Sequence, residues 1–470
     1  MNFPRTARNL LITLLCIVPT RANTPTLRPN IIVLLCDDLG YGDLSCFAHP
    51  EIHTPHIDQL AREGTRFTDC YSASPVCSPS RAGLMTGRTP NRLGIRDWIP
   101  PQSGIFLRPA EITVAQLLKK AGYRTFHAGK WHLNSRTDGS EPTPGDAGFD
   151  HWLYTQNNAA PSHLNPRNFI RNGQPAGPLK GPSSHIVVAE ATRWLEANRT
   201  PSSLTHTVSD APFFLNLWFH ETHEPVAASE EFLALYPDEK NPDRRHYLGA
   251  ASQMDAAVGQ LLRYLDEHGL RDNTFIYFSS DNGPETLKRY KGAERSYGSP
   301  GPLRGMKLHV TEAGYRVPGI IRWPGHVAAG ATSAEPICNL DFLPTACALA
   351  GIAPPRDRAL DGTSLLPLFA GQPITRPHPL YWQYDFSIGT PWTLALRDGP
   401  WKLLADATLT HVELYNLTAD LGEKQNLASE NPERVRAMTT TLRQLHAAIA
   451  AEGAQSGNPT ARAPATKKSD

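Results

Sequence analysis

The sequence predicts an α/β fold: a large, mixed and mostly parallel sheet sandwiched by helices, followed by a smaller C-terminal α+β subdomain. A continuous apolar run over residues 31–35 is typical of a strand buried on both faces of a parallel sheet. Helical and strand patterns then alternate to about residue 280, as in repeated βαβ units. Near residues 362–371 the pattern changes, and short strands follow one another without helices between them.

Each element follows from the local spacing of apolar residues. Short apolar runs between turn signals predict strands, and apolar residues recurring every three to four positions predict helices. The strands expected in the large sheet are 31–35, 123–128, 212–219 and 274–280. The helices expected between them are 112–120, 186–197 and 247–265.

The C-terminal quarter reads as a separate unit. Four short strands are expected there, at 380–382, 392–397, 401–404 and 413–415, before a closing helix over 431–452. We therefore divide the chain into a large α/β domain, 27–370, and an antiparallel-sheet subdomain, 375–452. The remaining stretch, 453–470, is polar and rich in small residues, so we expect it to be disordered.

The N-terminus has the three parts of a secretory signal peptide over residues 1–22. Arginines precede an apolar run at 10–18, and Thr20 and Ala22 are small residues before the expected cleavage point. The run is too short to span a bilayer. The residues before Cys16 fit a lipoprotein signal poorly. We expect an exported protein, periplasmic or secreted, with no membrane span.

Composition excludes several classes of function. The chain has 470 residues, with 46 Lys and Arg against 45 Asp and Glu, and it lacks basic runs with interleaved aromatics, which argues against nucleic-acid binding. Export permits disulfides, and six cysteines follow the leader. No two of them have CxxC spacing, which disfavours a structural zinc site.

Acidic and amide side chains follow two of the predicted strands. Asp37 and Asp38 come directly after the first strand, and Asp281 and Asn282 follow the strand at 274–280. Ligands of open α/β sheets bind at the carboxyl ends of strands, so these residues could meet. All-oxygen ligands suit Ca²⁺ or Mg²⁺. Each motif is also a good turn sequence, so a turn without a metal is the alternative for each motif alone.

A Pro-interrupted loop over 77–81 leads into a short helix. Cys77 at the helix start would have its thiolate stabilised by the helix dipole and by Arg81. These residues alone leave two readings open, a nucleophilic cysteine or one half of a disulfide.

The run from Cys77 to Arg88, Cys-x-Pro-Ser-Arg followed by Gly-Arg, resembles the signature of type I, formylglycine-dependent sulfatases of the alkaline-phosphatase superfamily. Further matches follow in the family's order along nearly the whole chain. They lie at 37–43, 54–67, 122–125, 129–133, 212–215, 222–225, 280–283, 303–307, 312–318, 323–325, 401–403 and 413–417. The stretch 220–225 resembles the arylsulfatase A and N-acetylgalactosamine-6-sulfatase branch.

The resemblance implies an alkaline-phosphatase-like fold and a modified nucleophile. Cys77 would be converted to Cα-formylglycine by a formylglycine-generating maturation enzyme. Asp37, Asp38, Asp281 and Asn282 would hold Ca²⁺, with Mg²⁺ possible, and the modified Cys77 would be a further ligand.

The resemblance also implies roles for basic residues. Arg81 would fix the aldehyde hydrate, and Lys130 and Lys307 would bind the sulfate oxygens. His132 would take a proton from the hydrate during sulfate release, and His223 would donate to the leaving-group oxygen.

These matches imply an exported sulfatase that hydrolyses sulfate monoesters of carbohydrates or aryl sulfates. A phosphodiesterase or phosphonate monoester hydrolase of the same superfamily and a non-catalytic binding protein are the alternatives. The loops 157–184 and 284–301 are expected to set substrate specificity. His220 could face the pocket or lie on its rim, whereas packing is the favoured role of Trp131.

Overall fold

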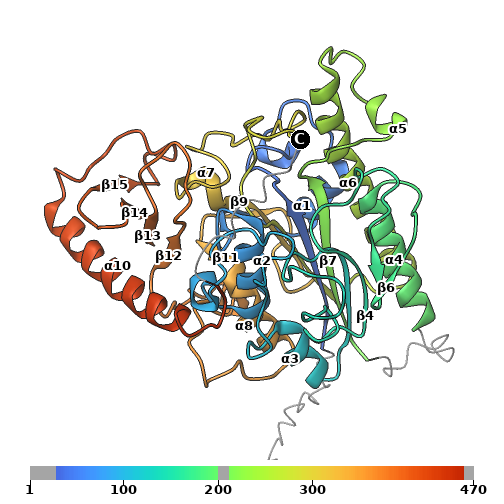
Figure 1. Cartoon of the computed structure of the whole chain (residues 1–470), viewed down its shortest axis with the longest axis horizontal. Coiled ribbons are helices and arrows are strands. Elements are labelled where there is room, and N and C mark those ends of the chain that lie inside the picture. Colours follow the sequence, from blue (N-terminus) through green and yellow to red (C-terminus); the bar gives the residue numbers. More distant parts are fainter. Residues whose placement is uncertain (1–27, 199–210, 460–470) are drawn as a thin grey trace, which may run out of the picture.

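The computed structural model describes residues 28–198 and 211–459. Figure 1 shows the whole chain, with its last part, in red, forming a unit at one side of the molecule. The large sheet has the strand order β10-β2-β9-β8-β1-β7-β3-β4-β5-β6, with β11 paired to β2. The strands are β1 (Asn30–Asp37), β2 (Thr65–Tyr71), β3 (Arg124–Lys130), β4 (His151–Thr155), β5 (Ile170–Arg171), β6 (Gln174–Pro175), β7 (Phe213–Thr222), β8 (Thr274–Ser280), β9 (Arg316–Arg322), β10 (Ala331–Ser333) and β11 (Ile337–Cys338).

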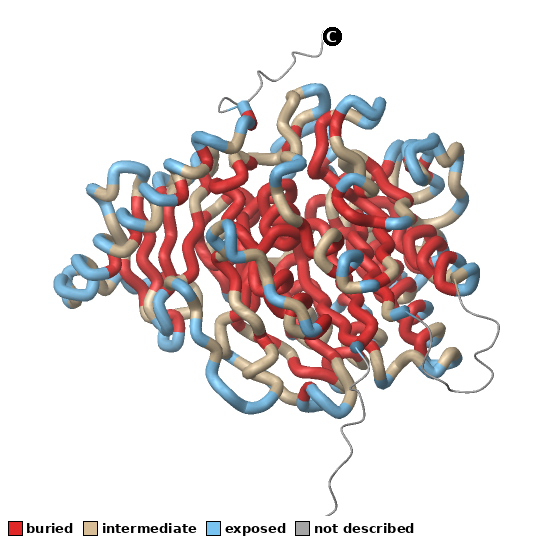
Figure 2. The backbone as a smooth tube through the Cα atoms, turned by 90° about the horizontal axis from the view of Figure 1, so that it is seen from below, coloured by how far each residue is buried: buried red, intermediate tan, exposed pale blue. Residues whose placement is uncertain are grey.

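Helices cover both faces of this sheet. Side chains of β1 alternate between two hydrophobic cores, with Val33 in one and Leu34 in the other. Helices α2 (Cys77–Thr86), α3 (Val114–Lys120) and α8 (Phe342–Leu349) pack into the first core. Helices α1 (Pro55–Glu63), α4 (Ser183–Ala197) and α6 (Pro242–Glu267) pack into the second. The other α-helices described in the large domain are short: α5 (Glu230–Leu233), α7 (Glu312–Tyr315) and α9 (Leu366–Phe369). Figure 2 shows the resulting band of buried backbone through the centre of the molecule.

Local sequence signals fix where the longer helices begin. Thr113 and Gln116 form a reciprocal capping box at the start of α3. The Asn241 side chain accepts hydrogen bonds from two backbone amides at the start of α6, where proline occupies the first helical position. These caps satisfy amide groups that have no partner inside the helix.

The C-terminal subdomain is a four-stranded antiparallel sheet against one long helix. Its strands are β12 (Leu380–Gln383), β13 (Leu394–Asp398), β14 (Trp401–Ala405) and β15 (Val412–Asn416), and its helix is α10 (Pro432–Gly453). One face of the sheet packs on α10. The other face packs on the large domain, in a core that includes Cys77. Strand residues of the subdomain therefore lie beside the start of α2.

The predicted fold class is confirmed: a mixed, mostly parallel sheet between helices, and a smaller antiparallel sheet after it. The expected signal peptide, 1–22, lies outside the described residues, as do residues 460–470 of the expected disordered tail. Residues 454–459 of that tail are bonded to the large domain, because the Asn458 amide donates to the backbone oxygens of Leu93 and Phe106. Within the described ranges, no helix combines the length and the hydrophobicity needed to cross a bilayer.

Candidate active site

Four adjacent parallel strands end at one edge of the large sheet. They are β8, β1, β7 and β3, in that spatial order. Asp37 ends β1 and Lys130 ends β3, while Asp281 directly follows β8 and His223 directly follows β7. The topology thus brings together residues that are far apart in the sequence, at the edge where α/β proteins bind ligands.

The backbone is unusually constrained at this edge. Asp38 and His132 have positive φ angles of 61° and 54°, a region that non-glycine residues seldom occupy and that is often found at functional sites. Glycines precede or follow site residues where the chains come closest. A Cβ atom at Gly129 would lie 1.7 Å from the Trp218 oxygen, and one at Gly283 would lie 1.7 Å from the Ala313 oxygen. Only glycine fits these two positions.

Asp37 and Asp281 form the deeper half of a buried charge cluster. The Lys130 Nζ lies 2.6 Å from Asp37 Oδ2. The Arg81 guanidinium lies 2.7 Å from Asp281 Oδ2 and 3.6 Å from Asp37 Oδ1. None of these four side chains has exposed surface.

Asp38 is the centre of the other half. The Lys307 Nζ lies 2.7 and 2.8 Å from its two carboxylate oxygens, and the Asn282 amide donates to Oδ1 over 2.7 Å. His223 Nε2 lies 3.6 Å from Asp38 Oδ2. The Asp38 amide donates to Asp281 Oδ1 over 3.3 Å, so the two halves are contiguous.

The carboxyl groups of the cluster are not all neutralised. Burial raises the pKa of Asp37, but Lys130 and the other positive charges nearby together outweigh burial and hold that pKa well below its usual range. Burial also raises the pKa of Asp38, but Lys307 together with other nearby positive charge lowers it overall. Burial and the charge of Asp37 raise the pKa of Asp281 to about 7. The third carboxyl group therefore has too little positive charge around it.

These donors fit a divalent cation. Asp37 Oδ1 and Asn282 Oδ1 are buried and have no hydrogen-bond partner among the described residues. Oxygen or nitrogen atoms of Asp37, Asp38 and His223 lie within 4.8 Å of one another. Unsatisfied buried oxygens beside a surplus carboxylate are what a hard cation such as Ca²⁺ or Mg²⁺ would satisfy.

Cys77 is the first residue of α2 and is 2% exposed. Burial raises the pKa of its thiol, against the lowering effect of Lys130 and Lys307. All six described cysteines are free, so the disulfide reading of Cys77 is wrong for this structure. Unmodified, Cys77 is a buried thiol that favours its neutral form.

Cys77 lies at the wall of a cavity of about 450 Å³. His132, His223 and Lys307 line the same cavity. The other predicted site residues lie outside its lining and are buried: Asp37, Asp38, Arg81, Lys130, Asp281 and Asn282. The structure thus brings all of the predicted site residues into one connected region, with four of them at the cavity surface.

The two cavity histidines are held by backbone oxygens. His132 Nε2 lies 3.1 Å from the Ile99 oxygen, and its Nδ1 is buried without a hydrogen-bond partner in residues 28–198 and 211–459. His223 Nδ1 lies 2.6 Å from the Glu224 oxygen, which leaves Nε2 directed towards Asp38. Burial lowers the pKa of both, that of His223 to about 4, and the charge of Lys130 or Lys307 lowers it further. Both rings are therefore neutral at neutral pH before substrate binds.

His220 is buried outside the cavity lining, and its Nε2 forms a 2.7 Å hydrogen bond with Thr155 Oγ1. It neither faces the pocket nor lies exposed on its rim, so both expected positions of His220 are wrong. Trp131 is buried and stacks on Trp218 with ring centroids 5.7 Å apart, which confirms the packing interpretation.

Part of the cavity wall was not found from the sequence. Trp98 comes from a loop after α2, and Tyr384, Phe386 and Ile388 come from the segment after β12 of the C-terminal subdomain. These residues belong to no local motif. Only the packing of the subdomain on the large domain brings Tyr384, Phe386 and Ile388 to Cys77.

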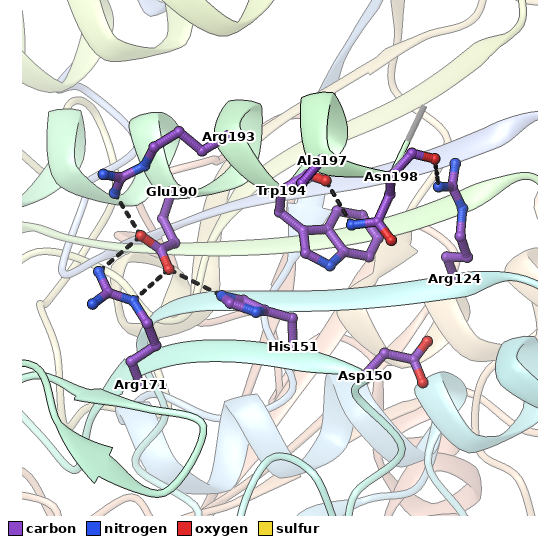
Figure 3. Close-up of a pocket in the computed structure, with 9 residues that line it drawn as sticks. All are labelled: Arg124, Asp150, His151, Arg171, Glu190, Arg193, Trp194, Ala197 and Asn198. Carbon is purple, nitrogen blue, oxygen red and sulfur yellow. Dashed lines mark hydrogen bonds and ion pairs between the residues drawn. The ribbon is translucent and has the colours of Figure 1, made fainter. Parts of the chain in front are cut away.

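A second hollow, of about 660 Å³, lies elsewhere in the large domain (Figure 3). Its central carboxylate, Glu190, is paired with Arg171, Arg193 and His151 at 2.6–3.0 Å. Arg124 and His151 begin their strands, so this hollow is at the end of the sheet opposite Asp37 and Lys130. It contains none of the predicted site residues.

Comparisons with known proteins agree with this geometry. The family model described as "Sulfatase" matches residues 29–352, and one described as "N-sulphoglucosamine sulphohydrolase, C-terminal" matches residues 306–451. Human arylsulfatase A is 34% identical over 450 residues, which cover 87% of this chain and 86% of that protein. Human N-acetylgalactosamine-6-sulfatase is 36% identical over 370 residues, covering 74% and 67%.

Solved structures share the whole fold. The crystal structure of Ps i-CgsB superposes with a TM-score of 0.79 at 29% identity and covers 92% of this chain and 95% of its own. A phosphonate monoester hydrolase of Agrobacterium radiobacter superposes with a TM-score of 0.62 at 21% identity, covering 90% and 96%, which shows a common fold alone. The chain belongs to the sulfatase family and is a sulfuric ester hydrolase.

Proposed function

We propose that the protein is an exported sulfatase that hydrolyses sulfate monoesters of carbohydrates with a formylglycine at position 77 and a bound Ca²⁺. The observation that carries this proposal is the connected cluster at the carboxyl edge of the sheet. In it, Cys77 shares a cavity with His132, His223 and Lys307, and unsatisfied buried oxygens lie at the adjoining carboxylates.

Asp37, Asp38, Asp281 and Asn282 would hold the cation, with Mg²⁺ as the alternative ion. When bound, it would supply Lewis-acid polarisation and neutralise the carboxylates. A thiolate is a soft ligand and a poor match for such an ion, which favours an oxygen function at position 77.

The hydrate of a formylglycine at position 77 would offer two hydroxyl groups. One would lose its proton and attack sulfur, and the alcohol of the ester would leave with a proton from His223, which gives a sulfated residue 77. The other would lose its proton and expel sulfate as the aldehyde reforms. His132 lines the cavity with an unpartnered Nδ1, an atom suited to accept that proton.

The basic residues around the cavity suit a sulfate group. Lys307 is at the cavity surface, and Lys130 and Arg81 are buried next to it, so their charges would stabilise an anion in a site with little water. His223 would donate from Nε2 to the leaving-group oxygen in its protonated form, because Nδ1–H donates to the Glu224 oxygen. The negative charge of a bound sulfate ester would favour that protonated form.

The names of similar proteins support a carbohydrate substrate. Human N-acetylgalactosamine-6-sulfatase is named for an amino-sugar sulfate. Ps i-CgsB has also been crystallised with k-i-k-neocarrahexaose, at 29% identity to this chain. Export rests on the N-terminal sequence, and N-terminal sequencing of the mature protein would test it.

The experiment that tests this function is direct. The protein is co-expressed with a formylglycine-generating enzyme, and the Cys77 peptide is examined by mass spectrometry for the aldehyde. Turnover of 4-nitrophenyl sulfate and of a panel of sulfated saccharides is then measured for the wild type and for Cys77→Ala. Full activity of a folded Cys77→Ala variant would overturn the proposal.

A further inference from the structure

The cavity beside Cys77 is lined by cations without any carboxylate among the described residues. The two lining cations are Lys307 and Arg289. Lys307 is paired with Asp38, in the part of the cavity to which we assign the sulfate group that is cleaved. Arg289 comes from a different segment, the loop 284–301, and so provides a second positive charge within the same cavity.

One edge of the Arg289 guanidinium is fixed and another is available. Its Nε and Nη2 lie 2.7 and 2.5 Å from Glu285 Oε2, and the group stacks on the Tyr290 ring at 5.5 Å. Glu285 is 4% exposed and also accepts the Leu287 amide over 3.1 Å, so it is itself held in place. The Arg289 Nη1 makes no hydrogen bond within the part of the chain that is described. The arginine is thus oriented by a buried carboxylate and keeps free donors.

The loop that carries Arg289 is attached to the catalytic segments at both ends. The Lys307 amide donates to the Pro284 oxygen over 2.9 Å. At the other end, the Ser299 oxygen accepts the Gly42 amide over 3.0 Å, and the Ser299 amide donates to Asp43 Oδ1 over 2.9 Å. These backbone hydrogen bonds therefore fix the ends of the loop that carries Arg289 relative to Lys307, the residue assigned to sulfate binding.

Much of the remaining cavity lining is apolar or aromatic. It includes Trp98, Leu308, Tyr384, Phe386 and Ile388. An apolar wall with a few placed polar groups is typical of a site that orients one ring of a ligand. A sugar ring held there would present its remaining substituents to the cationic side.

We propose that Arg289 binds a second anionic group of the substrate, a sulfate or a carboxylate, and that the enzyme prefers polyanionic saccharides to monosulfated neutral ones. The inference rests on the proposed function and names the substrate class of the same site. A guanidinium matches both oxyanions, because its donors lie in one plane and can engage two oxygens.

The test compares substrate pairs that share the cleaved ester. One pair is a monosulfate and the corresponding disulfate of galactose or N-acetylgalactosamine. The other is a monosulfated disaccharide with and without a uronate carboxylate. The ratio of kcat/KM values within each pair is measured for the wild type, Arg289→Ala and Lys291→Ala. Lys291 is an exposed cation of the same loop that does not line the cavity, so its variant controls for the loss of one charge.

The wild type should favour the polyanion in at least one pair. Arg289→Ala should lower that preference about 10- to 100-fold, the usual worth of a hydrogen bond to a charged group. Lys291→Ala should keep the wild-type ratio. Because Arg289→Ala leaves Glu285 buried and unpaired, the variant Arg289→Ala/Glu285→Gln is measured as well and should show the same loss.

Different outcomes would overturn the role of Arg289 and the proposed sulfatase function. Unchanged ratios in both pairs, or equal losses in Arg289→Ala and Lys291→Ala, overturn the role of Arg289 while the enzyme still cleaves sulfate esters. A matured wild type that cleaves none of the saccharides and no 4-nitrophenyl sulfate overturns the proposed function itself.

Discussion

The Nζ of Lys130 lies 2.6 Å from Oδ2 of Asp37, and neither side chain has exposed surface. Removing one partner of such a pair leaves a buried charge without compensation, at a cost of about 3–5 kcal/mol. The pair therefore links the stability of the fold to a lysine that we assign to sulfate binding.

Lys130→Ala should lower the free energy of unfolding by about 3 kcal/mol when measured by urea denaturation in a chelating buffer. Lys119→Ala is the control, since Lys119 also pairs with an aspartate at 2.7 Å but is half exposed. That variant should lose less than about 1 kcal/mol. Adding Asp37→Asn to Lys130→Ala should recover part of the loss. An equal fall in the free energy of unfolding in the two single variants would mean that burial does not determine how much the Lys130–Asp37 pair contributes to stability.

Removal of the divalent ion should destabilise the protein and stop turnover. An ion that binds only the native state stabilises it by about 2.7 kcal/mol at a concentration 100 times its Kd. Calcium added back to the chelated wild type should therefore raise Tm, whereas Asp281→Ala should show little response. Elemental analysis of purified wild type that finds one zinc and neither calcium nor magnesium would contradict the assignment.

The central part of the fold could be predicted from the sequence because its strands are buried on both faces. A run such as 31–35 is apolar throughout, and the strand observed there, Asn30–Asp37, extends it by only a few residues. Strands at the side of the sheet lack this signal. β2 mixes Arg66, Thr68 and Asp69 with apolar residues, and its place beside β9 depends on pairing with residues 316–322.

The same distinction applies to the active site: residues within short motifs could be predicted from the sequence, whereas other cavity residues could not. Its carboxylates and lysines lie within short motifs, so a resemblance to a family could assign them one by one. Arg289 and Phe386 lie in segments without a motif, and their place at the cavity depends on how the loop 284–301 and the C-terminal subdomain pack. Such contacts between distant segments are not encoded in any local pattern.

A buried carboxyl group away from the active site should make stability depend on pH. Asp255 of α6 is 1% exposed and accepts the His56 and Ile57 amides at the start of α1. Burial raises its pKa to about 7, and the charge of Asp58 adds to the effect. In the unfolded chain the group ionises near 4, so the folded state alone holds the proton between about pH 4 and 7. The stabilisation that protonated Asp255 gives the folded state is fully present below the pKa of the unfolded chain. It is lost as pH rises through the pKa of the folded protein.

The free energy of unfolding should therefore fall by about 2 kcal/mol more in the wild type than in Asp255→Asn between pH 5 and pH 7. Urea denaturation of both proteins at each pH, in the same calcium concentration, measures the difference and cancels the titration of all other groups. Parallel pH profiles would show that Asp255 ionises normally in the folded protein.

His223 should matter in proportion to how much the leaving group needs a hydrogen-bond or proton donor. Its Nδ1–H donates to the Glu224 oxygen, so the ring can donate to the substrate only from Nε2 and only when it is protonated. A nitrophenolate is stable when it leaves, whereas a sugar alkoxide is not. General acid catalysis is typically worth about 10²- to 10⁴-fold in rate.

His223→Ala should therefore lower kcat/KM far more for a sulfated sugar than for 4-nitrophenyl sulfate. Lys130→Ala is the matched variant, because its assigned partner is the sulfate that both substrates share, and it should lower the two kcat/KM values by similar factors. The measured quantity is the ratio of kcat/KM for the two substrates in each variant. If His223→Ala keeps the wild-type ratio, His223 is not the donor. A water molecule would then be the next candidate, since His220 bonds to Thr155 outside the cavity lining.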